Sequence, residues 1–103
     1  MTTTLGELAQ LVRSKNAGPF WLTIDVFLAT QRDYERAMSS LLTDPEHIAK
    51  TFGVPVATIR IFNLPHLKAI KVSLPRPVVQ GSLHDTDLHA GQQYVPLLDI
   101  AVD

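Results

Sequence analysis

The first stretch of the chain, where apolar residues recur every three or four positions, predicts an N-terminal helix. Apolar residues recur at helical spacing from Leu5 to Val12, and Thr4 lies three residues before Glu7, the spacing of a capping box. The segment 16–19, Asn-Ala-Gly-Pro, would end this helix. We therefore expect a helix from residue 4 that ends near residue 15.

A period of two then replaces the helical period and predicts strands. Residues 20–29 place Phe20, Leu22, Ile24, Val26 and Leu28 on one face, with Asp25 in the middle of the other. Two readings of Asp25 are open: a hydrogen-bonded or solvent-facing carboxylate, or a member of a site with the nearby residues 13–16.

Two helices are predicted next. Thr30 can cap the first helix, with Asp33 three residues further on. The second helix starts at Thr43 or Asp44, with proline in its first turn, and Gly53 is a typical terminator. Their apolar stripes indicate the core.

The rest of the chain predicts strands on either side of a long loop. Residues 58–63 and 69–74 alternate and would pair as antiparallel neighbours, and residues 97–102 would form a last strand. We expect one domain over residues 1–103 of the α+β class, with helices packed on one face of a small, mostly antiparallel sheet. The intervening loop, residues 75–96, is the expected functional segment.

Composition narrows the possible functions. The chain is 46% apolar and 18% charged, with a net charge of −1 and no cysteine. We therefore expect no disulfide and no thiolate zinc site. With no basic cluster, no long apolar run and no signal-peptide pattern, we expect no nucleic-acid or membrane partner and a cytoplasmic location. The excess of apolar residues favours a homo- or hetero-oligomer.

Most groups that could carry chemistry lie in the expected loop. Two imidazoles and two carboxylates within six positions form a ligand set that zinc or manganese accepts. Turn formation and a ligand site are the alternatives, and we expect no metal and no cofactor. The loop candidates for ligand binding are Arg76, His84, Asp85, Asp87, His89, Gln92, Gln93 and Tyr94.

Arg76 lies between two prolines that restrict the backbone. Its planar guanidinium could clamp a carboxylate or a phosphate, or form a surface salt bridge with Asp85 or Asp87. Further polar candidates come from the expected end of the first helix, where the arrangement does not fit a phosphate loop. They are Arg13, Lys15 and Asn16.

Several blocks of the sequence resemble the domain-of-unknown-function 4387 family. They are RSKNAGPF at 13–20 with LTID at 22–25, AIKVSLPRPVVQG at 69–81, DTD at 85–87, and the glutamine pair with PLLD within 92–99. The resemblance implies association with a larger protein related to the acyclic terpene utilisation family. It fixes no catalytic residue: His89 precedes the two glutamines and Tyr94 follows them, the reverse of the usual order in the family.

These observations give three hypotheses about function. The leading one is an accessory subunit or domain of a larger metabolic enzyme, a lyase, hydratase or isomerase acting on a carboxylate or an acyl-thioester. The alternatives are a purely structural interaction module, and a small enzyme with sites between protomers. The sequence leaves open whether the chain is catalytic alone.

Overall fold

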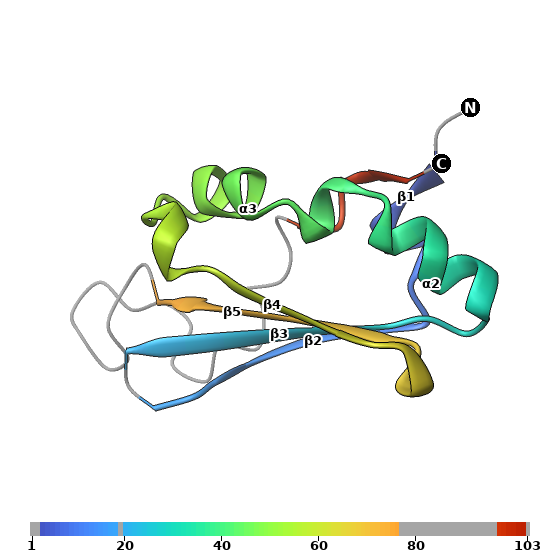
Figure 1. Ribbon diagram of the computed structural model, residues 1–103, viewed down its shortest axis with the longest axis horizontal. Coiled ribbons are helices and arrows are strands. Elements are labelled where there is room, and N and C mark those ends of the chain that lie inside the picture. Colours follow the sequence, from blue (N-terminus) through green and yellow to red (C-terminus); the bar gives the residue numbers. More distant parts are fainter. Residues whose placement is uncertain (1–2, 19, 77–96, 103) are drawn as a thin grey trace.

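A four-stranded antiparallel sheet forms the base of the molecule in the computed structural model, which describes residues 3–18, 20–76 and 97–102 (Figure 1). Its strand order is β2-β3-β5-β4. In the described part, a separate two-stranded ribbon joins the two ends of the chain, because β1 pairs with β6. The strands are β1 (Thr3–Thr4), β2 (Leu11–Asn16), β3 (Trp21–Phe27), β4 (Arg60–Leu64), β5 (Ala69–Pro75) and β6 (Ala101–Val102).

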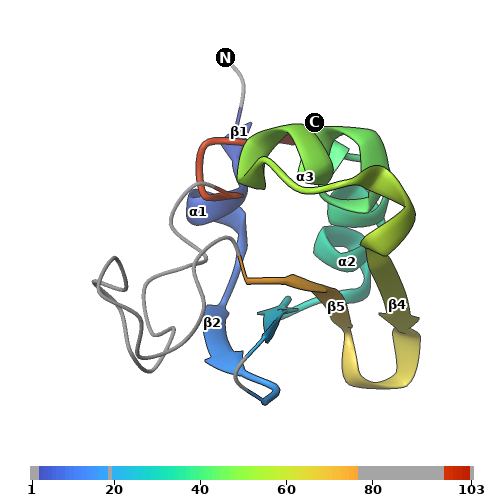
Figure 2. The ribbon, with the colours of Figure 1, turned by 90° about the vertical axis from the view of Figure 1, so that its left-hand side faces the viewer.

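The helices and the helical turns at 41–43 and 56–58 cover one face of this sheet, whereas the turn at 65–67 connects two strands at one end, as Figures 1 and 2 show from two directions. The chain is thus an α+β protein with a mostly antiparallel sheet, which confirms the predicted fold class. The elements are α1 (Leu5–Leu8), α2 (Gln31–Met38), α3 (Pro45–Phe52) and the 3-10 turns η1 (Leu41–Thr43), η2 (Val56–Thr58) and η3 (Pro65–Leu67).

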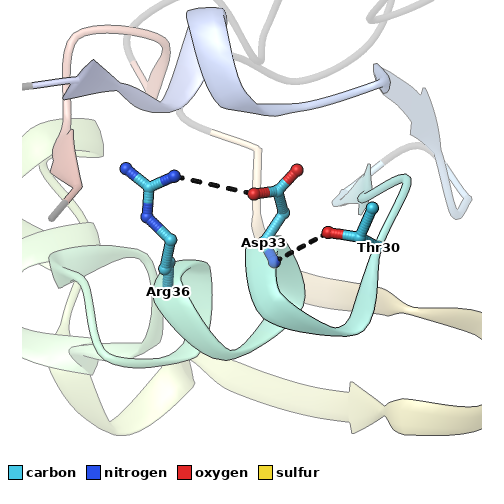
Figure 3. Close-up of polar contacts among 3 residues, drawn as sticks. All are labelled: Thr30, Asp33 and Arg36. Carbon is cyan, nitrogen blue, oxygen red and sulfur yellow. Dashed lines mark hydrogen bonds and ion pairs between the residues drawn. The ribbon is translucent and has the colours of Figure 1, made fainter.

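The start of α2 follows the predicted capping chemistry (Figure 3). The Thr30 hydroxyl accepts a hydrogen bond from the backbone N–H of Asp33 at 3.1 Å. One turn later, Arg36 lies 3.6 Å from the Asp33 carboxylate. Tyr34 and Ala37 point into the core, so the apolar stripe of this helix is structural.

Helix α3 also begins and ends where its sequence predicts. The Asp44 carboxylate accepts from the Glu46 backbone N–H at 3.0 Å, and Pro45 occupies the first turn. Gly53 ends the helix in the left-handed region, with φ of 68°. An L side chain rarely adopts this conformation, which explains the glycine.

The core lies between the helices and the inner face of the sheet. The alternation predicted for residues 20–29 is confirmed at Leu22, Ile24, Val26 and Leu28, which are all buried. Phe20, predicted on the same face, is 59% exposed. The predicted antiparallel pairing of β4 with β5 is also confirmed, with Ile61 opposite Val72. Strand β5 supplies Ile70, Val72 and Leu74 to the same core.

The predicted N-terminal helix is wrong beyond its first turn. Helix α1 ends at Leu8, Ala9 is extended, and β2 follows and pairs with β3 from Leu11 to Asn16. The Gln10 backbone N–H donates to the Phe27 carbonyl at 2.8 Å, which starts this pairing. The helical spacing was real but short, and pairing with a neighbouring strand decided the conformation of the next residues.

The predicted C-terminal strand is shorter than expected. Residues 97–99 form a turn, and only Ala101–Val102 pair as a strand. The backbone N–H groups of Leu5 and Gly6 donate to the carbonyls of Ile100 and Leu98 at 2.8 and 2.9 Å. These two hydrogen bonds join the start of α1 to the residues just before β6. Most of the expected loop, residues 77–96, lies outside the described residues.

Candidate functional site

Four of the predicted site residues lie in the described part of the chain, on two opposite sides of the sheet. Asn16 and Arg76 lie on the side of the helices, and Arg13 and Lys15 lie on the other side. The remaining candidates are outside the described residues: His84, Asp85, Asp87, His89, Gln92, Gln93 and Tyr94.

Arg76 and Asn16 meet at one end of the sheet although 60 positions separate them in the sequence. The guanidinium Nη1 of Arg76 donates to Asn16 Oδ1 at 2.8 Å. The Arg76 backbone N–H donates to the Phe20 carbonyl at 2.9 Å, which extends the pairing of β5 with the start of β3. The ends of three strands thus fix the position of this guanidinium.

Burial changes the interpretation of Arg76. Only 6% of the residue is exposed, so Arg76 is not a surface side chain. The predicted salt bridge to Asp85 or Asp87 involves residues outside the described ranges and stays a prediction. Pro75 is the last residue of β5, and Arg76 comes directly after it. Because Arg76 is two residues after the buried Leu74, both side chains lie on the helix side of the sheet. Removing a guanidinium from water is costly, so a buried arginine needs well-placed acceptors. Its partnership with Asn16 therefore has structural consequences as well as any functional ones.

Arg13 lies on the outer side of β2 and contacts β3. Its Nε is 3.6 Å from Asp25 Oδ2, and its guanidinium carbon lies 5.2 Å from the centre of the Phe27 ring. Asp25 is 6% exposed, which rules out a solvent-facing carboxylate. The contact with Arg13 shows a paired carboxylate, and membership of Asp25 in a site with residues 13–16 stays a prediction. Those residues form a strand and not a helix end.

Strand geometry explains why the four described candidates separate. Successive side chains of a strand point to opposite faces, so Arg13 and Lys15 share one face while Ser14 and Asn16 share the other. A helix would have grouped residues 13–16 around one end. The error in the N-terminal element therefore carried over into the predicted site.

The face of the four-stranded sheet opposite the helices, here called the outer face, holds residues that the sequence reasoning missed. Three large apolar side chains are exposed on it: Leu11 at 51%, Trp21 at 42% and Phe62 at 48%. Alternation could have placed Trp21 and Phe62 outward, but Leu11 lies in the segment predicted as a helix. The three residues lie on β2, β3 and β4 of the same face, Leu11 and Phe62 on its two opposite edges. The outer face is formed by Leu11, Arg13 and Lys15 of β2, Trp21, Thr23, Asp25 and Phe27 of β3, Ala69, Lys71, Ser73 and Pro75 of β5, and Arg60, Phe62 and Leu64 of β4.

Two groups in the described part have shifted pKa values with clear causes. Burial raises the pKa of Tyr34, whose hydroxyl has no hydrogen-bond partner among the described residues. Hydrogen bonds from the Thr4 backbone and hydroxyl lower the pKa of Glu7. Both groups belong to the fold: the first is in the core and the second caps α1.

No group of three or more metal-ligating side chains occurs in residues 3–18, 20–76 and 97–102. The two-histidine, two-aspartate segment at 84–89 lies outside these ranges, so the absence of a metal stays a prediction. Among the described helices, none is both long and apolar enough to cross a membrane.

Comparison with known proteins places the chain in a family. The model of the family described as "Domain of unknown function (DUF4387)" matches residues 5–101. No match was found among curated proteins or among solved structures. The match spans every strand of the four-stranded sheet together with α2 and α3. The chain belongs to the DUF4387 family.

Proposed function

We propose that the chain is an accessory subunit of a larger metabolic enzyme, which it binds through the outer face of its sheet. The observation that carries this proposal is the exposure of Leu11, Trp21 and Phe62 on that one face. Single exposed apolar residues are ordinary, and four others occur elsewhere in the described part: Phe20, Leu41, Val56 and Leu67. Leu11, Trp21 and Phe62 differ because they share the one sheet face that no helix covers, which suits a protein interaction site. The proposed partner is the larger protein related to the acyclic terpene utilisation family.

The position of Arg76 supports a contribution to a shared site. Pro75, the preceding residue, pairs with Trp21 across the β3–β5 ladder, so Arg76 lies at the Trp21 end of the sheet. Arg76 and Asn16 lie on the helix side, so a partner that covers Trp21 would reach them by extending around this end of the sheet. The planar fork of an arginine suits a carboxylate, which matches the proposed substrate class of carboxylates and acyl-thioesters.

Co-expression with the larger protein tests this proposal. The complex would be purified, and turnover of carboxylates and acyl-thioesters by lyase, hydratase or isomerase chemistry would be compared with that of each protein alone. We expect a stable complex and an activity that needs both chains. A larger protein that is equally active alone and does not bind this chain would contradict the proposal.

The same exposed face also favours the second candidate, a structural interaction module with no group in the active site. Arg76→Lys separates the two candidates, because it keeps the charge but removes the planar fork. If the subunit contributes to the site, the variant complex assembles and loses activity. If the chain is only structural, an assembled Arg76→Lys complex works like the parent.

A further inference from the structure

We infer that the outer face binds a protein surface that carries acidic groups around apolar ones. This inference rests on the proposed function and adds the chemistry of the partner surface. Its first support is the charge of the face: four cations, Arg13, Lys15, Arg60 and Lys71, accompany one carboxylate, Asp25.

The register of the sheet places these cations in two neighbouring rows of the outer face. Lys15 and Arg60 lie at the two ends of one row across the sheet, because Lys15 pairs with Thr23, Thr23 with Ser73, and Ser73 with Arg60. The cations are scattered along a chain whose net charge is −1, so the sequence shows no basic cluster.

In the neighbouring row, a carboxylate balances part of the positive charge. Asp25 pairs with Arg13 on one side and with Lys71 on the other, so two cations flank one buried carboxylate. The Arg13–Asp25 contact of 3.6 Å neutralises part of this row. The row of Lys15 and Arg60 carries two cations and no carboxylate, although Arg60 Nη1 already donates to the carbonyls of Ala57 and Ile59 at 2.7 and 3.0 Å. A partner would meet this row with carboxylates, and most directly at the exposed Lys15.

Apolar residues surround the charged rows. Leu11, Phe27 and Leu64 fall in one row across the sheet at one end, and Trp21 lies at the other end. Phe62 is exposed on the edge strand β4. Aromatic residues and arginine are enriched at protein–protein interfaces, and they dominate binding energies there.

The charged residues of the outer face disfavour two other binding partners. A second copy of the chain packed face to face would oppose cations with cations, which costs binding energy. A nucleic acid would place phosphates over Asp25, and the two exposed rings of the face, Trp21 and Phe62, lie on strands that β5 separates and form no continuous stacking surface. An acidic protein surface satisfies both the cations and the apolar residues.

Trp21 provides a direct probe, because it is the only tryptophan of the chain. Protein labelled with 5-fluorotryptophan gives one fluorine resonance, from the outer face, even in a mixture with an unlabelled partner. The larger protein of the acyclic terpene utilisation family would be titrated into the labelled chain. We expect this resonance to shift on binding, and we expect the affinity to fall as the salt concentration rises.

Matched variants test the charge and the apolar contact separately. We expect Lys15→Glu and Phe62→Ser each to weaken binding at least about tenfold, a loss typical of important interface residues. Lys50→Glu and Leu41→Ser are the controls, since both change exposed residues in the helical layer. The controls should bind like the parent chain.

The outcomes separate this inference from the proposed function. A complex that forms while the fluorine resonance and all four variants stay unchanged would overturn the inference and leave the accessory role intact. The absence of any complex would overturn both. A shift of the resonance caused by concentrating the chain alone, or by adding an oligothymidylate, would replace the inferred partner with a second copy or with a nucleic acid.

Discussion

At the scale of single residues, Tyr34 places a hydroxyl group in the core without a hydrogen-bond partner among the described residues. The ring is buried as well. Leaving a buried hydroxyl unpaired costs free energy that a phenylalanine would not lose. We expect Tyr34→Phe to raise the free energy of unfolding by about 1 kcal/mol in denaturant titrations. A loss of stability would show that the hydroxyl is well accommodated.

The same tyrosine predicts a pH dependence. Burial raises its pKa above the ordinary value of 10.0, so the folded chain holds the phenol proton after the unfolded chain has released it. The part of the unfolding free energy that depends on the Tyr34 proton is therefore fully present below pH 10. It is lost as the pH rises through the folded-state pKa of Tyr34. Measured against pH, the unfolding free energy of the parent should fall more steeply in this range than that of Tyr34→Phe. Parallel curves would contradict the shift.

Arg76 and Asn16 allow stability and function to be measured apart. Hydrogen bonds to charged groups contribute about 1.5–3 kcal/mol, so Asn16→Ala should lower the free energy of unfolding by roughly that amount. Arg76→Lys should cost about 1 kcal/mol or more, because the amine cannot reproduce the fork. A double-mutant cycle with thermal or chemical unfolding gives the coupling between the two positions. Additive effects would mean that the 2.8 Å contact contributes nothing to stability.

At the scale of elements, local sequence decided some boundaries and distant pairing decided others. Helix α3 could be predicted from Asp44, Pro45 and Gly53, because each acts within one turn of its own position. Strand β2 could not, because residues 11–16 depend on hydrogen bonds to β3, whose position no local signal gives. The contact of Asn16 with Arg76 is even harder to predict, because it depends on the order of three strands in the sheet.

The end of α3 gives a prediction for an element. Gly53 has φ of 68°, and a side chain added there would meet no neighbouring atom within 4 Å. The cost of a substitution is thus conformational and not steric. We expect Gly53→Ala to lower the free energy of unfolding by about 1–2 kcal/mol, and Gly53→Asn to cost less, because asparagine tolerates the left-handed region. Equal losses for the two variants would point to a cause other than φ.

At the scale of the whole molecule, the two faces of the sheet have different tasks. The inner face provides the core with the helices, as the alternation of apolar residues predicted. The outer face combines exposed apolar residues with cations from three segments of the chain. Alternation in the sequence could indicate its residues on β3, β4 and β5, but not those on β2, which was predicted as a helix. The arrangement of all of them could not be predicted, because it depends on strand order and register. Our proposal is that this outer face is where the chain meets its larger partner, with Arg76 on the opposite side of the sheet at its Trp21 end.

Light scattering coupled to size-exclusion chromatography tests that claim most directly. The isolated chain has a mass of 11.4 kDa, and it would be measured alone, with the larger protein, and as Lys15→Glu with the larger protein. We predict that the parent chain co-elutes with its partner in a fixed ratio and adds 11.4 kDa for each bound copy, whereas Lys15→Glu elutes largely alone. A parent chain that elutes separately from the larger protein at every concentration would contradict the account.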